Sequence, residues 1–244
     1  MDKRTEKLND TLIRMGVSLT EDMIKKLLMY YELLIERNRV MNLTAITEFE
    51  DVIIKHFADS LAPLSIECLA KSFTKPNCSL LDLGTGAGFP GLTLAIALPE
   101  TTVTLADSLN KRTNFLEDVK NNLKLDNINV VNGRAEDLGK TSDYREKFDI
   151  VVSRAVADYR ILCEYCLPFI KKGGIFAAWK GPAAAEETEN AKNALQILGG
   201  TEPDKKTYVL PITHEKRIIL VSYKKEMTPE KYPRKAGIPS KRPL

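Results

Sequence analysis

Apolar side chains in the first 70 residues recur at intervals of three and four, which is the spacing of one helix face. They are Ile24, Leu27, Leu28, Tyr31, Leu34 and Ile35. Thr20 stands before this stripe and is suited to cap the helix, and Asn42–Thr44 interrupts it. Thr47 and Glu50 have the spacing of a capping box, which predicts a second helix to about His56. The pattern therefore predicts a helical cap before the rest of the chain.

From Cys78 onward, short apolar runs alternate with helical stretches. Strands are predicted at Leu80–Leu83, Val103–Ala106, Ile128–Val131, Asp149–Ser153 and Gly174–Trp179. Helices are predicted at Gly91–Leu98, Lys111–Leu123, Tyr159–Ile170 and Ala183–Leu198. Such alternation is typical of a parallel sheet with right-handed crossovers.

The last two apolar runs have no helix between them. Lys206–Pro211 and Arg217–Tyr223 predict an antiparallel hairpin at the sheet edge. Five parallel strands closed by such a hairpin are typical of Rossmann-like methyltransferases, whereas dinucleotide dehydrogenases usually continue with a sixth parallel strand. We predict an α/β fold of the class I methyltransferase type, with a helical cap over 1–75, a Rossmann-like domain with a mostly parallel seven-stranded sheet over 76–224, and a C-terminal arm over 225–244.

Composition adds a charge asymmetry to this picture. The 244 residues carry a net charge of +3, but residues 223–244 carry +5 and the remainder carries −2. A locally basic end indicates contact with a polyanion, and a solvated tail is the alternative. Four prolines stiffen the end and favour a fixed, extended arm over a mobile tail. They are Pro229, Pro233, Pro239 and Pro243.

Cysteines and termini indicate the compartment. Cys163 and Cys166 form a lone C-x-x-C without a second pair, so we expect them in the core and expect no metal site. Met1–Asp10 is charged and has no signal-peptide core, and no apolar stretch approaches the roughly 20 residues of a membrane span. We expect a cytoplasmic protein that contacts no membrane.

The stretch Leu80–Gly91 places four glycines between a predicted buried strand and a predicted helix. A glycine turn at such a junction lets a nucleotide-type ligand approach the backbone. The sequence of this turn is compatible with two kinds of ligand. Gly86–Gly91 satisfies G-x-G-x-x-G, with Asp107 at the end of the next strand, as in dinucleotide-binding proteins. Asp82–Gly88 instead resembles the D-x-G-x-G-x-G turn of S-adenosylmethionine enzymes.

Two acidic positions favour the second ligand. Asp82 would repel a pyrophosphate, but suits the ammonium group of a methionine moiety. Glu136 and Asp137 follow the third strand, where a carboxylate could bind the adenine amino group. Asp107 accepts from ribose hydroxyls with either ligand. We therefore predict S-adenosyl-L-methionine as methyl donor, with S-adenosyl-L-homocysteine as product, and a turn without a ligand is the remaining alternative.

Several segments together resemble one family over nearly the whole chain. The segments are Asn42–Ile46, His56–Leu61, Gly84–Gly91, Asp107–Arg112, Ser153–Ala157, Trp179–Gly181 and Tyr232–Pro239. The Phe-Pro-Gly ending of the turn, the Ser-Arg-Ala segment and the basic proline-rich end are the most specific of these. The chain resembles the bacterial small-subunit ribosomal RNA guanine-N7 methyltransferases, also called glucose-inhibited division protein B.

The resemblance implies methylation of guanine N7 in 16S ribosomal RNA, at position 527 in the 530 loop. N7 has a free lone pair and loses no proton, so in-line transfer needs no obligatory general base, and alignment of the reacting atoms carries the catalysis. The implied partner is 16S ribosomal RNA or the small ribosomal subunit, and we expect a monomer. A non-catalytic RNA-binding or ribosome assembly factor and a nicotinamide-dependent oxidoreductase are the alternatives.

The resemblance also implies roles for single residues around the donor. The donor loop would consist of Gly84, Gly86 and Gly88, behind Asp82. Phe89 would pack at the edge of the donor.

Further along the chain, Asp107 with Ser108 would bind the ribose, and Ala135 with Glu136 or its neighbour Asp137 would contact adenine.

The other implied residues concern the second substrate and the cap. Arg154 matches the active-site arginine of the family and would hold the methionine carboxylate or a phosphate. Arg134 and Lys180 are further candidates for RNA or active-site contacts. We expect His56 and Asp59 to hold the helical cap against the sheet, and Trp179 to lie in the core.

Overall fold

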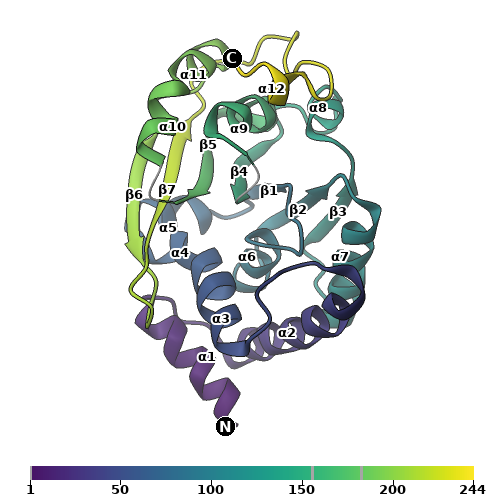
Figure 1. Cartoon of the computed structure of the whole chain (residues 1–244), viewed down its shortest axis with the longest axis vertical. Helices are drawn as coiled ribbons and strands as arrows, with labels where there is room; N and C mark the ends of the chain where they lie inside the picture. Colours follow the sequence, from purple (N-terminus) through teal and green to yellow (C-terminus); the bar gives the residue numbers. More distant parts are fainter. Residues whose placement is uncertain (1, 155–156, 182–183) are drawn as a thin grey trace.

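A seven-stranded sheet with helices on both faces forms the centre of the molecule (Figure 1). The computed structural model describes residues 2–154, 157–181 and 184–244. The strand order is β3-β2-β1-β4-β5-β7-β6; β1 to β5 are parallel, and β7 is antiparallel to both of its neighbours. The predicted mixed sheet is confirmed. The strands are β1 Ser79–Leu83, β2 Thr102–Asp107, β3 Ile128–Asn132, β4 Phe148–Arg154, β5 Ile170–Lys180, β6 Asp204–Val209 and β7 Lys216–Tyr223.

The helices form two layers, each with its own cluster of buried apolar side chains. The cap together with α6 and α7 covers one face of the sheet, and α9 to α11 cover the other. The cap helices are α1 Lys3–Arg14, α2 Glu21–Met41, α3 Phe49–Val52, α4 Asp59–Ser65 and α5 Glu67–Phe73. The later helices are α6 Gly91–Ala97, α7 Asn110–Leu123, α8 Ala135–Leu138, α9 Tyr159–Cys166, α10 Ala184–Asn190, α11 Lys192–Leu198 and α12 Ile238–Lys241.

The start of the second cap helix differs from the prediction. Thr20 caps α2 as expected, accepting a hydrogen bond from the Met23 amide. The capping box is wrong, because α3 has Glu48 at its N-cap and no side-chain bond there. The helix also does not end at His56, but continues through the π-helical turn Ile53–Ala58 into α4. Its apolar side chains are buried along this whole stretch, and that packing sustains the helix.

Two predicted helices beyond the cap are also shorter in the structure. The helix after β4 ends at Cys166, and Leu167–Phe169, which contains Pro168, makes a 3-10 turn before β5 begins at Ile170. The helix predicted from Ala183 divides at Ala191 into α10 and α11. Ala183, and Ala155 and Val156 of the Ser-Arg-Ala segment, lie outside the described residues.

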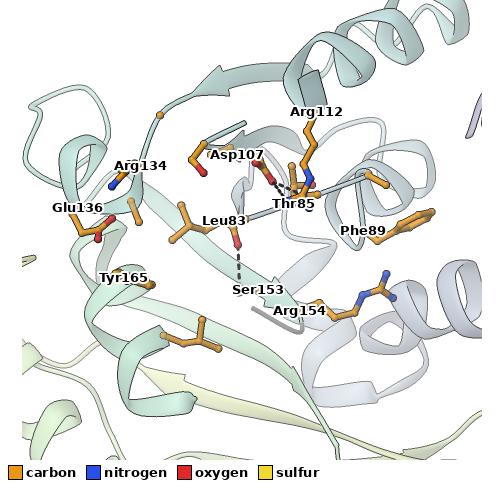
Figure 2. Close-up of a pocket in the computed structure, with 18 of the residues that line it drawn as sticks. Leu83, Thr85, Phe89, Asp107, Arg112, Arg134, Glu136, Ser153, Arg154 and Tyr165 are labelled. Atoms are coloured by element: carbon orange, nitrogen blue, oxygen red, sulfur yellow. Dashed lines mark hydrogen bonds and ion pairs between the residues drawn. The ribbon is translucent and has the colours of Figure 1, made fainter. Parts of the chain in front are cut away.

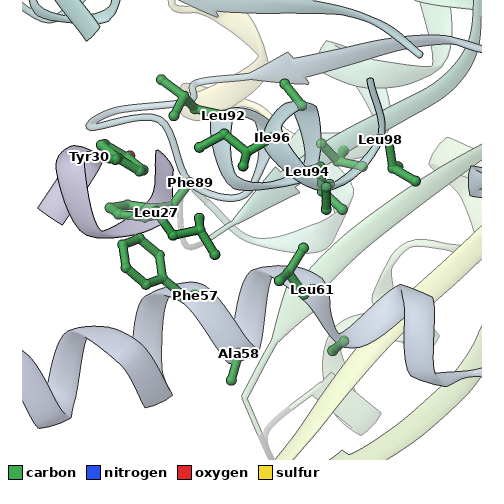
Figure 3. Close-up of a cluster of buried hydrophobic side chains, with 14 of the residues drawn as sticks. Leu27, Tyr30, Phe57, Ala58, Leu61, Phe89, Leu92, Leu94, Ile96 and Leu98 are labelled. Atoms are coloured by element: carbon green, nitrogen blue, oxygen red, sulfur yellow. The ribbon is translucent and has the colours of Figure 1, made fainter. Parts of the chain in front are cut away.

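The cap packs directly on the glycine turn. Tyr30 of α2 stacks on Phe89, Phe57 lies beside both rings, and all three side chains are buried (Figure 3). The Tyr30 hydroxyl donates to the Ala87 carbonyl at 2.5 Å. A Cβ on Gly88 would lie 2.7 Å from the Tyr30 hydroxyl oxygen, so this glycine is needed for the close approach of the cap.

The basic C-terminal segment is held on the body by specific contacts. Arg234 pairs with the buried carboxylate of Glu164 on α9 at 2.5 Å, and its amide also donates to that carboxylate. Arg145 donates to the carbonyls of Thr228 and Tyr232. The segment is fixed, as predicted, but its end forms helix α12 instead of staying extended. The division into cap, central domain and arm stays a prediction.

Candidate active site

A cavity of about 690 Å³ opens at the carboxyl ends of β1, β2 and β4. Ligands of α/β proteins bind at this edge, in pockets of about 300–1,000 Å³. Figure 2 shows its lining in three parts. Arg134, Glu136 and Tyr165 lie at one end, Thr85, Asp107 and Arg112 lie in the middle, and Phe89 and Arg154 lie at the other end.

Asp82 lies beneath the glycine turn and not in the cavity. Its Oδ2 accepts hydrogen bonds from the Thr85 hydroxyl and the Gly91 amide, both at 2.7 Å, and its side chain is buried. Burial raises the pKa of Asp82 to about 6, against the lowering effect of these hydrogen bonds. Asp82 therefore shapes the turn from below, and it is not placed to contact a methionine ammonium group as expected.

Replacing Asp82 by asparagine should change the pH dependence of stability. The pKa of Asp82 is about 6 in the folded chain and about 3.8 when solvated, so the native state binds its proton more tightly. The contribution of Asp82 to the free energy of unfolding therefore falls as pH rises from about 4 to about 6, and is constant above that. Urea unfolding of wild type and Asp82→Asn across pH 4–7 should show the difference, wild type minus variant, falling with pH. A constant or rising difference contradicts the raised pKa.

The glycine turn and Asp107 form the middle of the cavity. Gly84 and Gly86 line it; Gly86 has φ of +62°, and a Cβ there would have no protein atom within 4 Å. That open position is a cradle which a side chain would fill and a ligand can approach. Asp107 Oδ2 accepts from the Gly86 amide at 3.0 Å and from Arg112, while Oδ1 accepts from the Leu109 amide.

Ser108 is exposed beside Asp107 and also lines the cavity. Gly88 of the glycine turn faces the cap and lies outside the lining.

The end of the cavity beyond β3 contains Ala135 and Glu136, the predicted adenine contacts. Glu136 is buried, whereas Asp137 is exposed and does not line the cavity. Glu136 Oε1 accepts a hydrogen bond from the Gly237 amide at 2.9 Å. Gly237 therefore fastens the C-terminal arm to this wall of the cavity.

Arg154 occupies the opposite end and is bound to the cap. Its Nη1 donates to Asp59 Oδ2 at 2.9 Å, and its Nη2 donates to His56 Nδ1 at 3.1 Å. The guanidinium lies over the Phe89 ring at 5.3 Å, and His56 stacks on the same ring at 4.3 Å. Burial and, next, the Arg154 charge lower the pKa of His56 to about 3, so the imidazole is neutral. His56 and Asp59 hold cap to sheet as predicted, and His56 also lines the cavity.

The structure does not bring Lys180 into the cavity. Its ammonium group donates to Glu187 at 2.6 Å and to the Ala157 carbonyl at 2.5 Å, and its side chain is nearly buried. Successive side chains of a strand point to opposite faces, so Lys180 and Trp179 diverge. Trp179 is buried as predicted, and its indole N–H donates to the Asp59 carbonyl at 2.8 Å.

The cysteines of the C-x-x-C pair lie in the core and not in the cavity lining. Cys163 and Cys166 are buried in α9, as predicted, and burial raises the pKa of both thiols. Among the described residues, no three His, Cys, Asp or Glu side chains are grouped to hold a metal ion. In the same ranges of the chain, no helix is long and apolar enough to cross a membrane.

Several lining residues were not predicted from the sequence. Six of them are Leu43, Thr44, Arg112, Tyr165, Gly237 and Ser240. Arg112 lies in the first turn of α7, five residues after Asp107, so its closeness in sequence to the end of β2 was a usable signal. The others come from the cap, from α9 and from the arm, and only the tertiary packing brings them to the cavity.

Comparison with known proteins decides the family. The family model of rRNA small subunit methyltransferase G matches residues 23–215. The chain belongs to this family. It is 50% identical over 241 residues to Ribosomal RNA small subunit methyltransferase G of Lachnoclostridium phytofermentans, with 97% of each chain covered. It is 48% identical to the protein of that name from Acetivibrio thermocellus, with 100% of each chain covered.

Solved structures with little sequence identity share the fold of this methyltransferase G family member. A mutant of the 16S rRNA (adenine(1408)-N(1))-methyltransferase from Catenulisporales acidiphilia aligns with a TM-score of 0.51 at 16% identity, over 66% of this chain and 91% of that one. A putative sarcosine dimethylglycine methyltransferase of Galdieria sulphuraria aligns with a TM-score of 0.52 at 12% identity, over 74% and 89%. The predicted class I methyltransferase fold is confirmed.

Proposed function

We propose that this chain transfers the methyl group of S-adenosyl-L-methionine to N7 of a guanine in 16S ribosomal RNA. One observation carries the proposal beyond family membership. A single cavity joins an open glycine turn, the buried carboxylates of Asp107 and Glu136, and the guanidinium of Arg154. This series of groups offers separate places for the methionine, ribose and adenine parts of the donor, which supplies an electrophilic methyl on sulfur.

The lining residues divide the binding work along the cavity. Gly84 and Gly86 would bring backbone against the donor, and Asp107 with Ser108 would face the ribose. Ala135 and Glu136 would face the adenine, since Glu136 is a buried acceptor at the far end.

Arg154 and Phe89 occupy the methionine end. Arg154 Nη1 donates to Asp59 Oδ2, to the Lys55 carbonyl and to the Ser60 hydroxyl, and Nη2 donates to His56. A guanidinium has five N–H groups. Within the described residues, Nε–H and one Nη2–H have no recorded acceptor, and this proposal assigns them to the methionine carboxylate. Arg134 is exposed at the opposite end, where it would contact RNA.

The groups at the reacting end suit a transfer without a base. His56 is neutral, but its Nδ1 lone pair is already occupied by Arg154, so it is not free to take a proton. Methylation at N7 releases no proton, since the nitrogen attacks the methyl group with its own lone pair. The chain would accelerate the transfer by aligning the two substrates in the cavity.

The proposed partner is 16S ribosomal RNA or the small ribosomal subunit, met by a monomer in the cytoplasm. Exposed basic side chains of the arm, Lys231, Lys235 and Lys241, lie on the segment that forms one wall of the cavity, and they suit a phosphate backbone.

Mapping of methylated guanine by mass spectrometry tests the proposal. Small-subunit RNA from cells lacking the protein should lack one N7-methylguanine, and purified protein with labelled donor should restore it. Full methylation without the protein, and no transfer in vitro, would contradict it. An Asp107→Ala or Arg154→Ala chain that fully replaces wild type in the assay would favour an assembly factor. Saturable dinucleotide binding without response to S-adenosylmethionine would favour an oxidoreductase.

A further inference from the structure

The loop after α2 fixes one threonine at the wall of the cavity. The Thr44 amide donates to Asn38 Oδ1 and the Asn38 side-chain amide donates to the Thr44 carbonyl, both at 2.9 Å. One side chain at the end of α2 thus holds both backbone groups of Thr44. Thr44 lines the cavity together with Leu43 and His56.

A directed series of hydrogen bonds runs from Arg154 to Thr44. A guanidinium can only donate, so His56 Nδ1 accepts from Arg154, and in the neutral ring the proton is on Nε2. Nε2–H then donates to Thr44 Oγ1, at 2.9 Å. Burial and the Arg154 charge lower the pKa of His56 to about 3, although the backbone of Lys55 acts to raise it. The imidazole ring therefore stays neutral.

Thr44 is left with one hydrogen-bonding function. Its Oγ1 also accepts from the Ile46 amide at 3.0 Å, so both lone pairs are used. Within residues 2–154, 157–181 and 184–244, no group accepts the proton of this hydroxyl. The hydroxyl of this cavity-lining residue therefore has a donor, and only a donor, left for a ligand.

The position of this donor selects which substrate it can meet. Thr44 contacts His56, which stacks on Phe89 beside Arg154, at the end of the cavity away from Glu136. If adenine of the methyl donor lies against Glu136, the Thr44 end is left for the base that receives the methyl group. Guanine presents two acceptors, N7 and O6, on one edge, whereas adenine presents an amino donor in place of O6.

We propose that the Thr44 hydroxyl donates to O6 of the target guanine, which turns N7 toward the methyl group and selects guanine over adenine. The inference rests on the proposed function, because it assigns a specificity-determining residue to that reaction. An adenine at this place would set its amino group against a hydroxyl with no lone pair left. The network through His56 and Arg154 holds the hydroxyl in the donating state.

The test pairs a substrate change with a side-chain change. Small-subunit RNA would carry guanine or 2-aminopurine at the target position; 2-aminopurine keeps N7 and has no group at C6. We expect wild type to lose about tenfold in kcat/KM on 2-aminopurine, the size of one hydrogen bond. Thr44→Val should lose about tenfold on guanine and nothing further on 2-aminopurine.

Three controls separate this role from a structural one. Thr44→Ser keeps the hydroxyl and should stay near wild type on guanine. Thr47→Val, on the same loop with an exposed side chain, should change neither substrate. The dissociation constant of S-adenosylhomocysteine should be equal in wild type and Thr44→Val.

Distinct outcomes overturn the inference and the function. Equal wild-type rates on guanine and 2-aminopurine overturn the role of Thr44 without any variant. Equal losses of Thr44→Val on both substrates show that the threonine only supports the fold, and overturn it too. Absence of transfer by wild type to the guanine substrate instead contradicts the proposed function.

Discussion

Arg154→Ala is expected to lower kcat/KM for methyl transfer by about a hundredfold. The arginine lines the cavity, and within the described residues its Nε–H and one Nη2–H have no recorded acceptor. Hydrogen bonds to a charged group contribute about 1.5–3 kcal/mol. The substitution also leaves the Asp59 carboxylate, which is 7% exposed, without its ion pair at 2.9 Å. Steady-state kinetics should show a higher KM for the methyl donor together with a lower kcat, and calorimetry a weaker donor affinity.

Two further variants identify the cause of that loss. Arg154→Lys keeps the charge but not the planar fork, and should recover only part of the activity. Arg160→Ala removes a half-exposed ion pair with Asp158 outside the cavity, and should leave kinetics unchanged. An unchanged donor dissociation constant in Arg154→Ala would contradict the assignment of Arg154 to the methionine carboxylate.

Arg234→Ala is expected to reduce the free energy of unfolding by about 3 kcal/mol and to weaken donor binding. The substitution leaves Glu164, only 1% exposed, without its charged partner, and breaking a buried pair costs about 3–5 kcal/mol. The Arg234 amide still donates to Glu164, which sets the loss at the lower end. Gly237 follows three residues later, so release of the arm also frees Glu136 at the cavity wall.

Urea unfolding measures the change in the free energy of unfolding, and titration with the methyl donor measures the change in its affinity. Lys235→Ala, the exposed neighbour, is the matched control and should change neither. Adding Glu164→Gln to Arg234→Ala removes the unpaired charge, and should recover part of the lost stability. If Arg234→Ala binds the methyl donor as tightly as wild type, the C-terminal arm does not contribute to the pocket.

The sheet was predictable because its strands are short apolar runs separated by helices and its last two runs have none between them. The ends of the helices were not predictable, since they depend on packing. The π-helical turn after α3 is sustained by buried Ile53 and Phe57, and nothing local distinguishes it from a helix end at His56. The capping box predicted at Thr47 is wrong, because a threonine followed three residues later by a glutamate is also compatible with a loop.

The candidate site was predictable where it follows strand ends. Asp107 is the last residue of β2 and Glu136 follows β3 closely, and both line the cavity. Asp82 and Lys180 were misplaced, because sequence alone does not say which face of the sheet a strand residue points to. Thr44 lies in the cap, and its approach to the cavity depends on how two distant segments pack.

Trp179 is the only tryptophan of the chain, and its position gives the protein an internal optical reporter. Its indole bonds to the backbone of Asp59, whose carboxylate holds Arg154. Intrinsic fluorescence excited selectively at this residue therefore reports on the boundary between the cap and the sheet. Methyl donor and RNA both meet the protein beside that boundary, so their binding can be followed in the unlabelled chain.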